Sequence, residues 1–189
     1  MRAWIPLVLA SSIASPMLVP LLPAHAAEGL GDLPIVQTPL KTAIGDFAEH
    51  RHLVDANVGY RFIPKVDGFI VGLGSSCAPG ERTVRLYRES DAAELAMAAV
   101  STIQAGVWNY TEVSPVLVSS GTSYVVASRS TGDYCLTAVE SWPIEGTAVR
   151  IEAGVGNGNL ATDAMPQEST GWNVLGLPDV KFLPLGIFP

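Results

Sequence analysis

The chain has 189 residues, of which 18 are acidic and 11 are basic, and its formal net charge at pH 7 is −7. An acidic chain whose basic residues are scattered is a poor nucleic-acid binder and a poor ligand for anionic lipid. Hydrophobic residues make up 48% of the chain, too many for a disordered protein, so we expect a folded domain.

The first 26 residues have the pattern of a cleavable secretory signal peptide. Arg2 supplies a positive charge, residues 3–22 carry no other charge, and Ala24-His25-Ala26 has the small-x-small pattern of a cleavage site. An uncleaved membrane anchor is the alternative, but the prolines in this segment would break a spanning helix. The sequence therefore predicts export as a soluble protein, secreted or periplasmic, with no membrane insertion after cleavage.

Residues 27–56 are predicted to form an N-terminal arm, because Pro34, Pro39 and Gly45 interrupt any long element. The arm carries His50 and His52, whose spacing would place both on one side of a strand, as in some metal sites. No third ligand is identifiable, so we expect a solvated polar segment and no metal. The remaining residues, 57–189, have the length of one domain.

From Val58 onward, apolar and polar residues alternate in short runs that end at Gly or Pro. This pattern predicts an all-β domain, an antiparallel β-sandwich or jelly roll of about nine strands. Residues 90–100 are ambiguous: Asp91 and Glu94 could cap a helix, whereas the position between alternating runs favours a hairpin ending in a strand over 95–103. We expect the hairpin. The other expected strands cover 59–63, 66–73, 83–88, 107–110, 116–118, 122–127, 135–139, 147–151 and 179–183.

The chain has two cysteines, Cys77 and Cys135, and both lie in the exported part. An even number of cysteines in an oxidising compartment predicts a disulfide. Closing a loop of this length would stabilise the fold by about 4 kcal/mol on the chain-entropy model. A metal site would need more ligands than the neighbours of these cysteines offer.

Short motifs from Gly59 to Phe182 follow one another in a recognisable order. They lie at 59–62, 66–74, 84–87, 95–100, 108–110, 115–118, 121–125 and 178–182. In this order they resemble a family of bacterial extracellular domains of unknown function, found in secreted multidomain proteins beside immunoglobulin-like repeats and polysaccharide-active modules. The resemblance implies a β-sandwich in an extracellular setting and transfers no catalytic residue. The chain departs from the family at Arg88, where Asp is common, and at 75–81, where a cysteine-bearing segment replaces an Asp- and Gly-rich loop, so no family ion site carries over to that loop.

Two tryptophans occupy polar, turn-like contexts and are candidate ligand-binding residues. Trp142 lies between Ser and Pro, and Trp172 precedes Asn173. The C–H face of a sugar ring stacks on an indole, while a neighbouring amide or carboxylate binds its hydroxyls. The alternative is that both rings pack under loops. Trp108, in an alternating run, is expected in the core.

A calcium site and glycoside hydrolysis have weaker support from the sequence. Asn157, Asn159 and Asp163 could supply oxygen ligands to calcium, although a plain turn or loop is the simpler interpretation. Glu140, Glu145 and Glu152 lie near adjacent expected strands, where a pair could hydrolyse a glycoside, but exposed strand-edge acids are common without catalysis.

Three functions are compatible with these features. The first is a secreted, non-catalytic binding or surface-associating module with a glycan or cell-surface polymer as partner and no cofactor. The second is a structural subunit of an extracellular matrix or filament, in which the arm adds a strand to a neighbour's sheet. The third, a glycoside hydrolase, is disfavoured because the chain has no nucleophile elbow or metal constellation.

Overall fold

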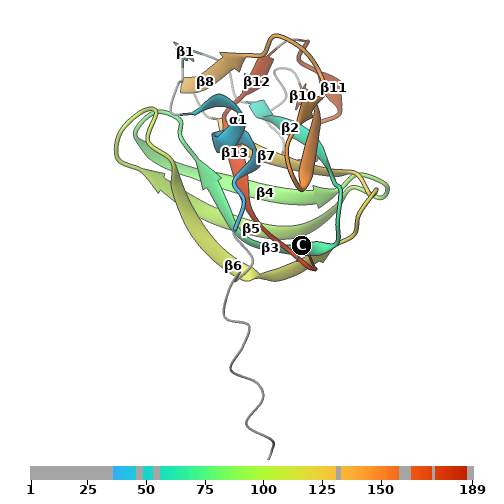
Figure 1. Ribbon diagram of the computed structural model, residues 1–189. Helices are drawn as coiled ribbons and strands as arrows, with labels where there is room; N and C mark the ends of the chain where they lie inside the picture. The colour runs from blue at the N-terminus through green and yellow to red at the C-terminus, as the bar shows by residue number, and fades with distance from the viewer. Residues whose placement is uncertain are drawn as a thin grey trace, which may run out of the picture. The chain divides into compact units, whose positions relative to one another are not determined.

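Figure 1 shows the computed structural model, which describes residues 36–45, 49–52, 56–130, 133–157, 163–171 and 173–186. These residues belong to one unit, Asp32–Pro189. The expected signal peptide lies outside the described residues. In the described part, no helix has the length and apolar character of a membrane span. The domain is nearly all β-strand with one short helix, and its strand pairs are antiparallel, which confirms the predicted fold class.

The largest sheet has seven strands, and each hydrogen-bonds only to antiparallel neighbours. Six strands follow the order β11-β10-β2-β7-β4-β5, and β9 pairs with the outer edge of β10. Their bounds are β2 Ala56–Pro64, β4 Gly80–Arg88, β5 Ala93–Thr102, β7 Tyr124–Ser130, β9 Ile144–Glu145, β10 Val149–Gly156 and β11 Glu168–Ser169.

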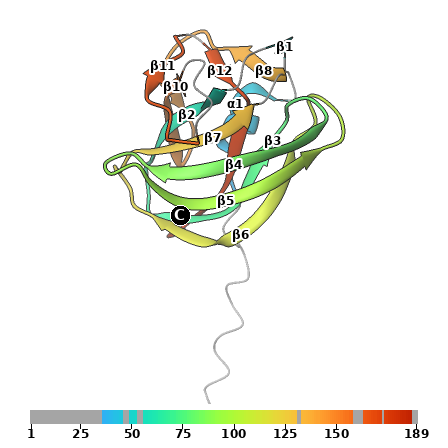
Figure 2. The same ribbon diagram turned by 180° about the vertical axis from the view of Figure 1, so that it is seen from behind.

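Two three-stranded sheets complete the fold. The first, β13-β3-β6, packs against the inner face of the large sheet, and the second, β1-β8-β12, lies at the upper end in Figures 1 and 2. Gly154 of β10 allows the second to approach, because a Cβ there would lie 1.9 Å from the carbonyl oxygen of Asn173. The bounds are β1 Glu49–His52, β3 Gly68–Ser75, β6 Asn109–Val118, β8 Asp133–Ala138, β12 Asn173–Leu175 and β13 Pro178–Pro184.

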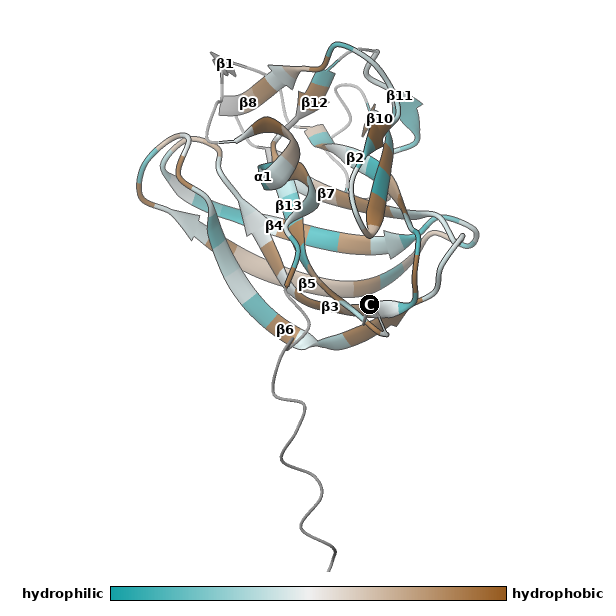
Figure 3. Cartoon of the chain, in the orientation of Figure 1, coloured by the Kyte–Doolittle hydropathy of each residue, from teal (hydrophilic) through white to brown (hydrophobic). Residues whose placement is uncertain are grey.

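Alternation along the strands builds the core between the sheets. Tyr60 and Phe62 of β2 and Val126 of β7 point inward and meet Ile70 of β3 and Phe182 of β13, and all five side chains are fully buried. Figure 3 shows the resulting apolar bands on the strands. Trp108 belongs to the same cluster, as its alternating run predicted.

The ambiguous segment after residue 90 is a β-hairpin, as expected. Strand β5 pairs with β4 along its whole length, from Ala93 opposite Arg88 to Thr102 opposite Gly80. Tertiary pairing therefore overrides the helical propensity of this alanine-rich segment.

One strand expectation is wrong. The runs 107–110 and 116–118 were expected as separate strands, but residues 109–118 form a single strand, β6, that passes through Pro115 and leaves Val107 and Trp108 outside it. The pairing of β6 with β3 shifts register between Ile70 and Gly72, opposite this proline. A proline, which lacks an N–H, is tolerated at such an irregularity on an edge strand.

The disulfide between Cys77 and Cys135 is present, which confirms the predicted pairing. It joins the segment after β3 to β8, and both cysteines are fully buried. The backbone N–H of Ala78 also donates to Cys135 Sγ. The bond therefore ties the end of the large sandwich to the small upper sheet.

A helix, α1 (Pro39–Ile44), lies within the segment that the sequence left without structure. The first N–H groups of any helix have no intrahelical acceptor. Thr38, at the N-cap, makes no side-chain capping bond. Instead the carboxylate of Asp179 on β13 accepts the backbone N–H groups of Leu40 (3.1 Å) and Lys41 (3.0 Å). A residue far along the chain thus caps the helix.

The Asp179 carboxylate is fully buried and binds two tyrosines as well as the helix. The hydroxyl of Tyr60 donates to Oδ1 (2.8 Å) and that of Tyr110 to Oδ2 (3.0 Å). Burial raises the pKa of Asp179 above its ordinary value, although its hydrogen bonds oppose the shift. Burial and the nearby Asp179 charge raise the pKa of Tyr60 well above its ordinary value. Four donors therefore converge on one carboxylate.

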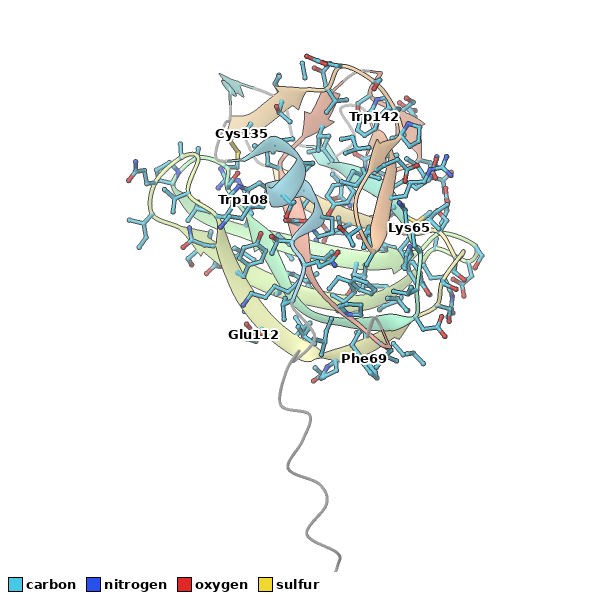
Figure 4. The ribbon with its side chains drawn as sticks, in the orientation of Figure 1. Lys65, Phe69, Trp108, Glu112, Cys135 and Trp142 are labelled. Carbon is cyan, nitrogen blue, oxygen red and sulfur yellow. A yellow bond between two sulfur atoms is a disulfide. The ribbon has the colours of Figure 1, made fainter. Side chains whose placement is uncertain are left out.

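The other end of α1 is held by Trp108. Its indole N–H donates to the carbonyl oxygen of Gly45 (2.8 Å), the residue that ends the helix with a φ of 67°. Trp108 stacks on Tyr110, with ring centroids 6.3 Å apart. Figure 4 shows Trp108 beside the helix. The residues around Asp179 and Trp108 therefore fix both ends of α1 on the sandwich.

The disulfide is expected to stabilise the domain against unfolding. The loop it closes spans a sequence separation of 58, which corresponds to about 4 kcal/mol in the free energy of unfolding. A Cys77→Ser/Cys135→Ser variant should lose about this amount in urea unfolding, and a reductant should destabilise only the parent chain. An unchanged midpoint in the reduced parent chain would contradict the structural role.

Asp179 gives a pH-dependent test. The folded state holds the Asp179 proton more tightly than the unfolded chain, so the stability contributed by this group falls as pH rises from the ordinary aspartate pKa through the raised one. Asp179→Asn removes the titration. Over that window, the stability of the parent chain relative to this variant should therefore decline, as measured by urea unfolding from about pH 3.5 to pH 7.

Asp179→Ala should cost about 3 kcal/mol in the free energy of unfolding, since it removes the acceptor of two buried and two partly buried hydrogen bonds. In the pH experiment with Asp179→Asn, a parent chain that became more stable relative to that variant as pH rose would contradict the raised pKa of Asp179.

Candidate functional site

Two adjoining cavities lie between α1 and the chain segment 137–151. The larger, of about 590 Å³, is lined by Ala43 and Ile44 of the helix and by residues 137–141 and 143–145. The smaller, of about 340 Å³, is lined by residues 36–39, Thr42 and Ala43 on one side and by residues 144–147, Val149 and Ile151 on the other. Both volumes fall in the range of small-molecule sites. Because the cavities share Ala43, Ile144 and Glu145, we treat them as one cleft, called the α1 cleft.

The wall opposite the helix is the turn between β9 and β10, and Lys65 holds it. The Lys65 side chain donates to the Gly146 carbonyl oxygen (2.8 Å) and pairs with Glu145 (2.6 Å), and its backbone N–H donates to the Ala148 carbonyl oxygen. Figure 4 places Lys65 near one end of β10. At the same wall, the Ala148 N–H donates to the Gln37 side chain at 3.3 Å. Both walls of the cleft are therefore fixed by contacts that need no ligand.

The cleft carries two carboxylates in different states. Glu145 pairs with Lys65 and Arg150, and its pKa is lowered, first by the hydrogen bond from Lys65. Glu140 is exposed, lines the larger cavity and forms no ion pair with any residue in the described ranges. Among the residues that the structure describes, the lining of the two cavities includes no Lys, Arg or His. In the described lining, Glu140 is thus a carboxylate without an ion-pair partner.

Hydrolysis of a glycoside needs a general acid whose pKa is raised. Of the three acids considered for this role, Glu145 has a lowered pKa, and Glu152 pairs with Arg150 at 3.0 Å. The lowered pKa of Glu145 suits ion pairing and does not suit proton donation.

Trp142 does not line the cleft. Its half-buried ring packs against the core, and its indole N–H donates to the Gly171 carbonyl oxygen (2.7 Å). Figure 4 shows it at the upper end of the domain. Asn173 begins β12 opposite Ala138, and its carbonyl oxygen accepts the Thr170 hydroxyl. Trp172 lies outside the described residues, so its role as a candidate ligand-binding residue stays a prediction.

The candidate calcium ligands are engaged elsewhere. Asp163 pairs through one oxygen with Arg129 (2.9 Å) and through the other with Arg85 (3.0 Å), and Asn157 Oδ1 accepts the Asn57 N–H (2.9 Å). Asn159 lies outside the described residues. Two guanidinium groups at Asp163 repel a cation, and the contacts instead bind this segment to the outer face of the large sheet.

No metal-ligating group emerges in the described part of the chain, where no three His, Cys, Asp or Glu side chains come together. His50 and His52 lie in β1, opposite Cys135 and Asp133 of β8. Their side chains lie outside what the structure describes.

Sequence reasoning missed the cleft because its two walls come from segments about a hundred residues apart. Helix α1 has only six residues and no local capping side chain. The one available signal was the proline at its start with a glycine just after its end, an arrangement typical of helix boundaries.

Comparison with known proteins adds a family but no activity. A search of curated proteins found no match. A family model described as a domain of unknown function (DUF4082) matches residues 42–175. This match covers most of the chain, from within α1 to the end of β12. The chain therefore belongs to this family of domains of unknown function, DUF4082.

Proposed function

We propose that this chain is an exported, non-catalytic binding module that takes a carbohydrate ligand in the α1 cleft. The observation that carries the proposal is the preformed cleft itself, whose helix wall is anchored at both ends and whose opposite wall is held by Lys65. Binding to a preorganised site avoids the cost of ordering its walls. Export is supported by the expected signal peptide and by the disulfide, a bond typical of oxidising compartments.

The chemistry of the larger cavity suits a sugar. Pro143 and Ile144 offer an apolar surface for the C–H face of a ring, while Glu140, Ser141 and Thr137 offer oxygen atoms for its hydroxyl groups. A hydrogen bond to a charged acceptor contributes about 1.5–3 kcal/mol, so Glu140 should be the strongest single contact. This role replaces the tryptophan platform that the sequence suggested.

The structural-subunit alternative has less support. Residues 36–45, in the segment proposed to reach a neighbour, pack on their own domain. Gln37 exchanges two backbone hydrogen bonds with Phe182, and Leu40 is fully buried. The described end of the arm therefore has its partners within the chain.

Screening the exported chain on an array of bacterial and plant glycans, followed by calorimetry of any hit, tests the proposal. Glu140→Gln should weaken binding about tenfold, because a charged acceptor is lost. Ala43→Trp should abolish it, since this exposed helix residue lines both cavities.

The matched controls are Glu81→Gln and Ala105→Trp. Both positions are exposed and line neither cavity, so these variants should bind as the parent chain does. An array on which the parent chain binds no glycan would refute the proposal, and so would equal losses in the control variants.

A further inference from the structure

The character of the α1 cleft changes along its length. The larger cavity carries Glu140 and Ser141, whereas the smaller one exposes more apolar than polar surface. Half of its lining residues are apolar, namely Val36, Pro39, Ala43, Ile144, Val149 and Ile151. Val149 and Ile151 are buried, and Val36 keeps 42% of its surface exposed.

The carboxylate and the amide of the smaller cavity are engaged already. Glu145 pairs with Lys65 and Arg150, and Gln37 accepts the Ala148 N–H. The hydroxyls of Thr38, Thr42 and Thr147 remain as hydrogen-bonding side chains in that lining. A sugar ring in the smaller cavity would therefore satisfy few of its own hydroxyl groups, and the loss of those hydrogen bonds with water would oppose binding.

An alkyl chain has no hydroxyl groups, so it loses no hydrogen bonds with water when it enters the smaller cavity. Each buried methylene contributes about 0.8 kcal/mol, which is about a fourfold gain in affinity. The contacts of α1 and Lys65 already fix the cavity walls on both sides. The binding free energy from buried methylenes is therefore not reduced by a cost of ordering these walls.

We propose that the natural ligand is an amphiphilic glycan, with its sugar in the larger cavity and a short alkyl or acyl chain in the smaller one. This inference rests on the proposed carbohydrate function and assigns the chemistry of the second half of the same site. The shared residues Ala43 and Ile144 mark the junction where the sugar meets the chain.

Calorimetry with methyl, butyl, hexyl and octyl β-glucosides, each below its micelle concentration, tests the inference on the full exported chain. Affinity should rise by about two- to fourfold per methylene until the cavity is filled. Thr42→Trp, which fills the smaller cavity, should flatten this rise with chain length. Val36→Ser, at the rim, should reduce the gain per methylene.

Lys41→Trp is the control, because Lys41 is exposed on the same helix and lines neither cavity. It should keep the full dependence on chain length. Equal affinity for all four glucosides would overturn the amphiphilic ligand and leave the carbohydrate function standing. Octanol binding as tightly as octyl glucoside would overturn both, since the sugar would then contribute nothing. A chain-length gain that Thr42→Trp does not reduce would also overturn the inference, because the chain would lie elsewhere.

Discussion

The candidate site depends on the hydrogen bonds that the buried carboxylate of Asp179 accepts from α1. A carboxylate that is buried away from water destabilises the folded state unless hydrogen bonds within the protein replace those with water. Here the compensation comes from three separate parts of the chain: two backbone N–H groups of α1, the hydroxyl of Tyr60 on β2 and that of Tyr110 on β6. The same bonds that satisfy Asp179 join the helix to both packed sheets. Removing the helix would expose the carboxylate, and removing the carboxylate would uncap the helix.

Several of these residues lie in short motifs that the sequence showed at 59–62, 108–110 and 178–182. Tyr60, Trp108, Tyr110 and Asp179 come from three such motifs, and in the structure they meet around the two ends of α1. Short motifs that look unrelated in the sequence therefore serve one purpose, which is to position a six-residue helix. That helix supplies one wall of the α1 cleft.

The fold could be predicted because the sequence patterns that indicate it lie within short segments of the chain. Alternation revealed most strands, and the paired cysteines indicated the bond between Cys77 and Cys135. Where a local rule failed, a tertiary contact explains it. Pro115 did not end β6, because the strand is irregular there and needs no N–H from that residue.

The site was harder to predict because it depends on contacts between residues that are far apart in the sequence. Helix α1 is capped by a residue 139 positions away from Leu40, so no cap was readable beside it. Trp142 stands in a turn-like sequence that suggested exposure, yet its ring packs on the core and its N–H is bound to Gly171. Glu140 stood among several acids of similar context, and only the cleft singles it out.

Amide hydrogen exchange in an Asp179→Asn variant tests most directly whether this carboxylate positions the helix. The substitution keeps the shape of the side chain but replaces one of the two oxygens that accept the helix N–H groups with an NH2 group, which donates and does not accept. We predict that amides of residues 42–45 exchange at least about tenfold faster, while those of β2 and β7 keep their protection. Unchanged exchange in α1 would contradict the account. An equal loss of protection throughout the large sheet would contradict it too, because Asp179 would then support the whole fold and not the wall of the cleft.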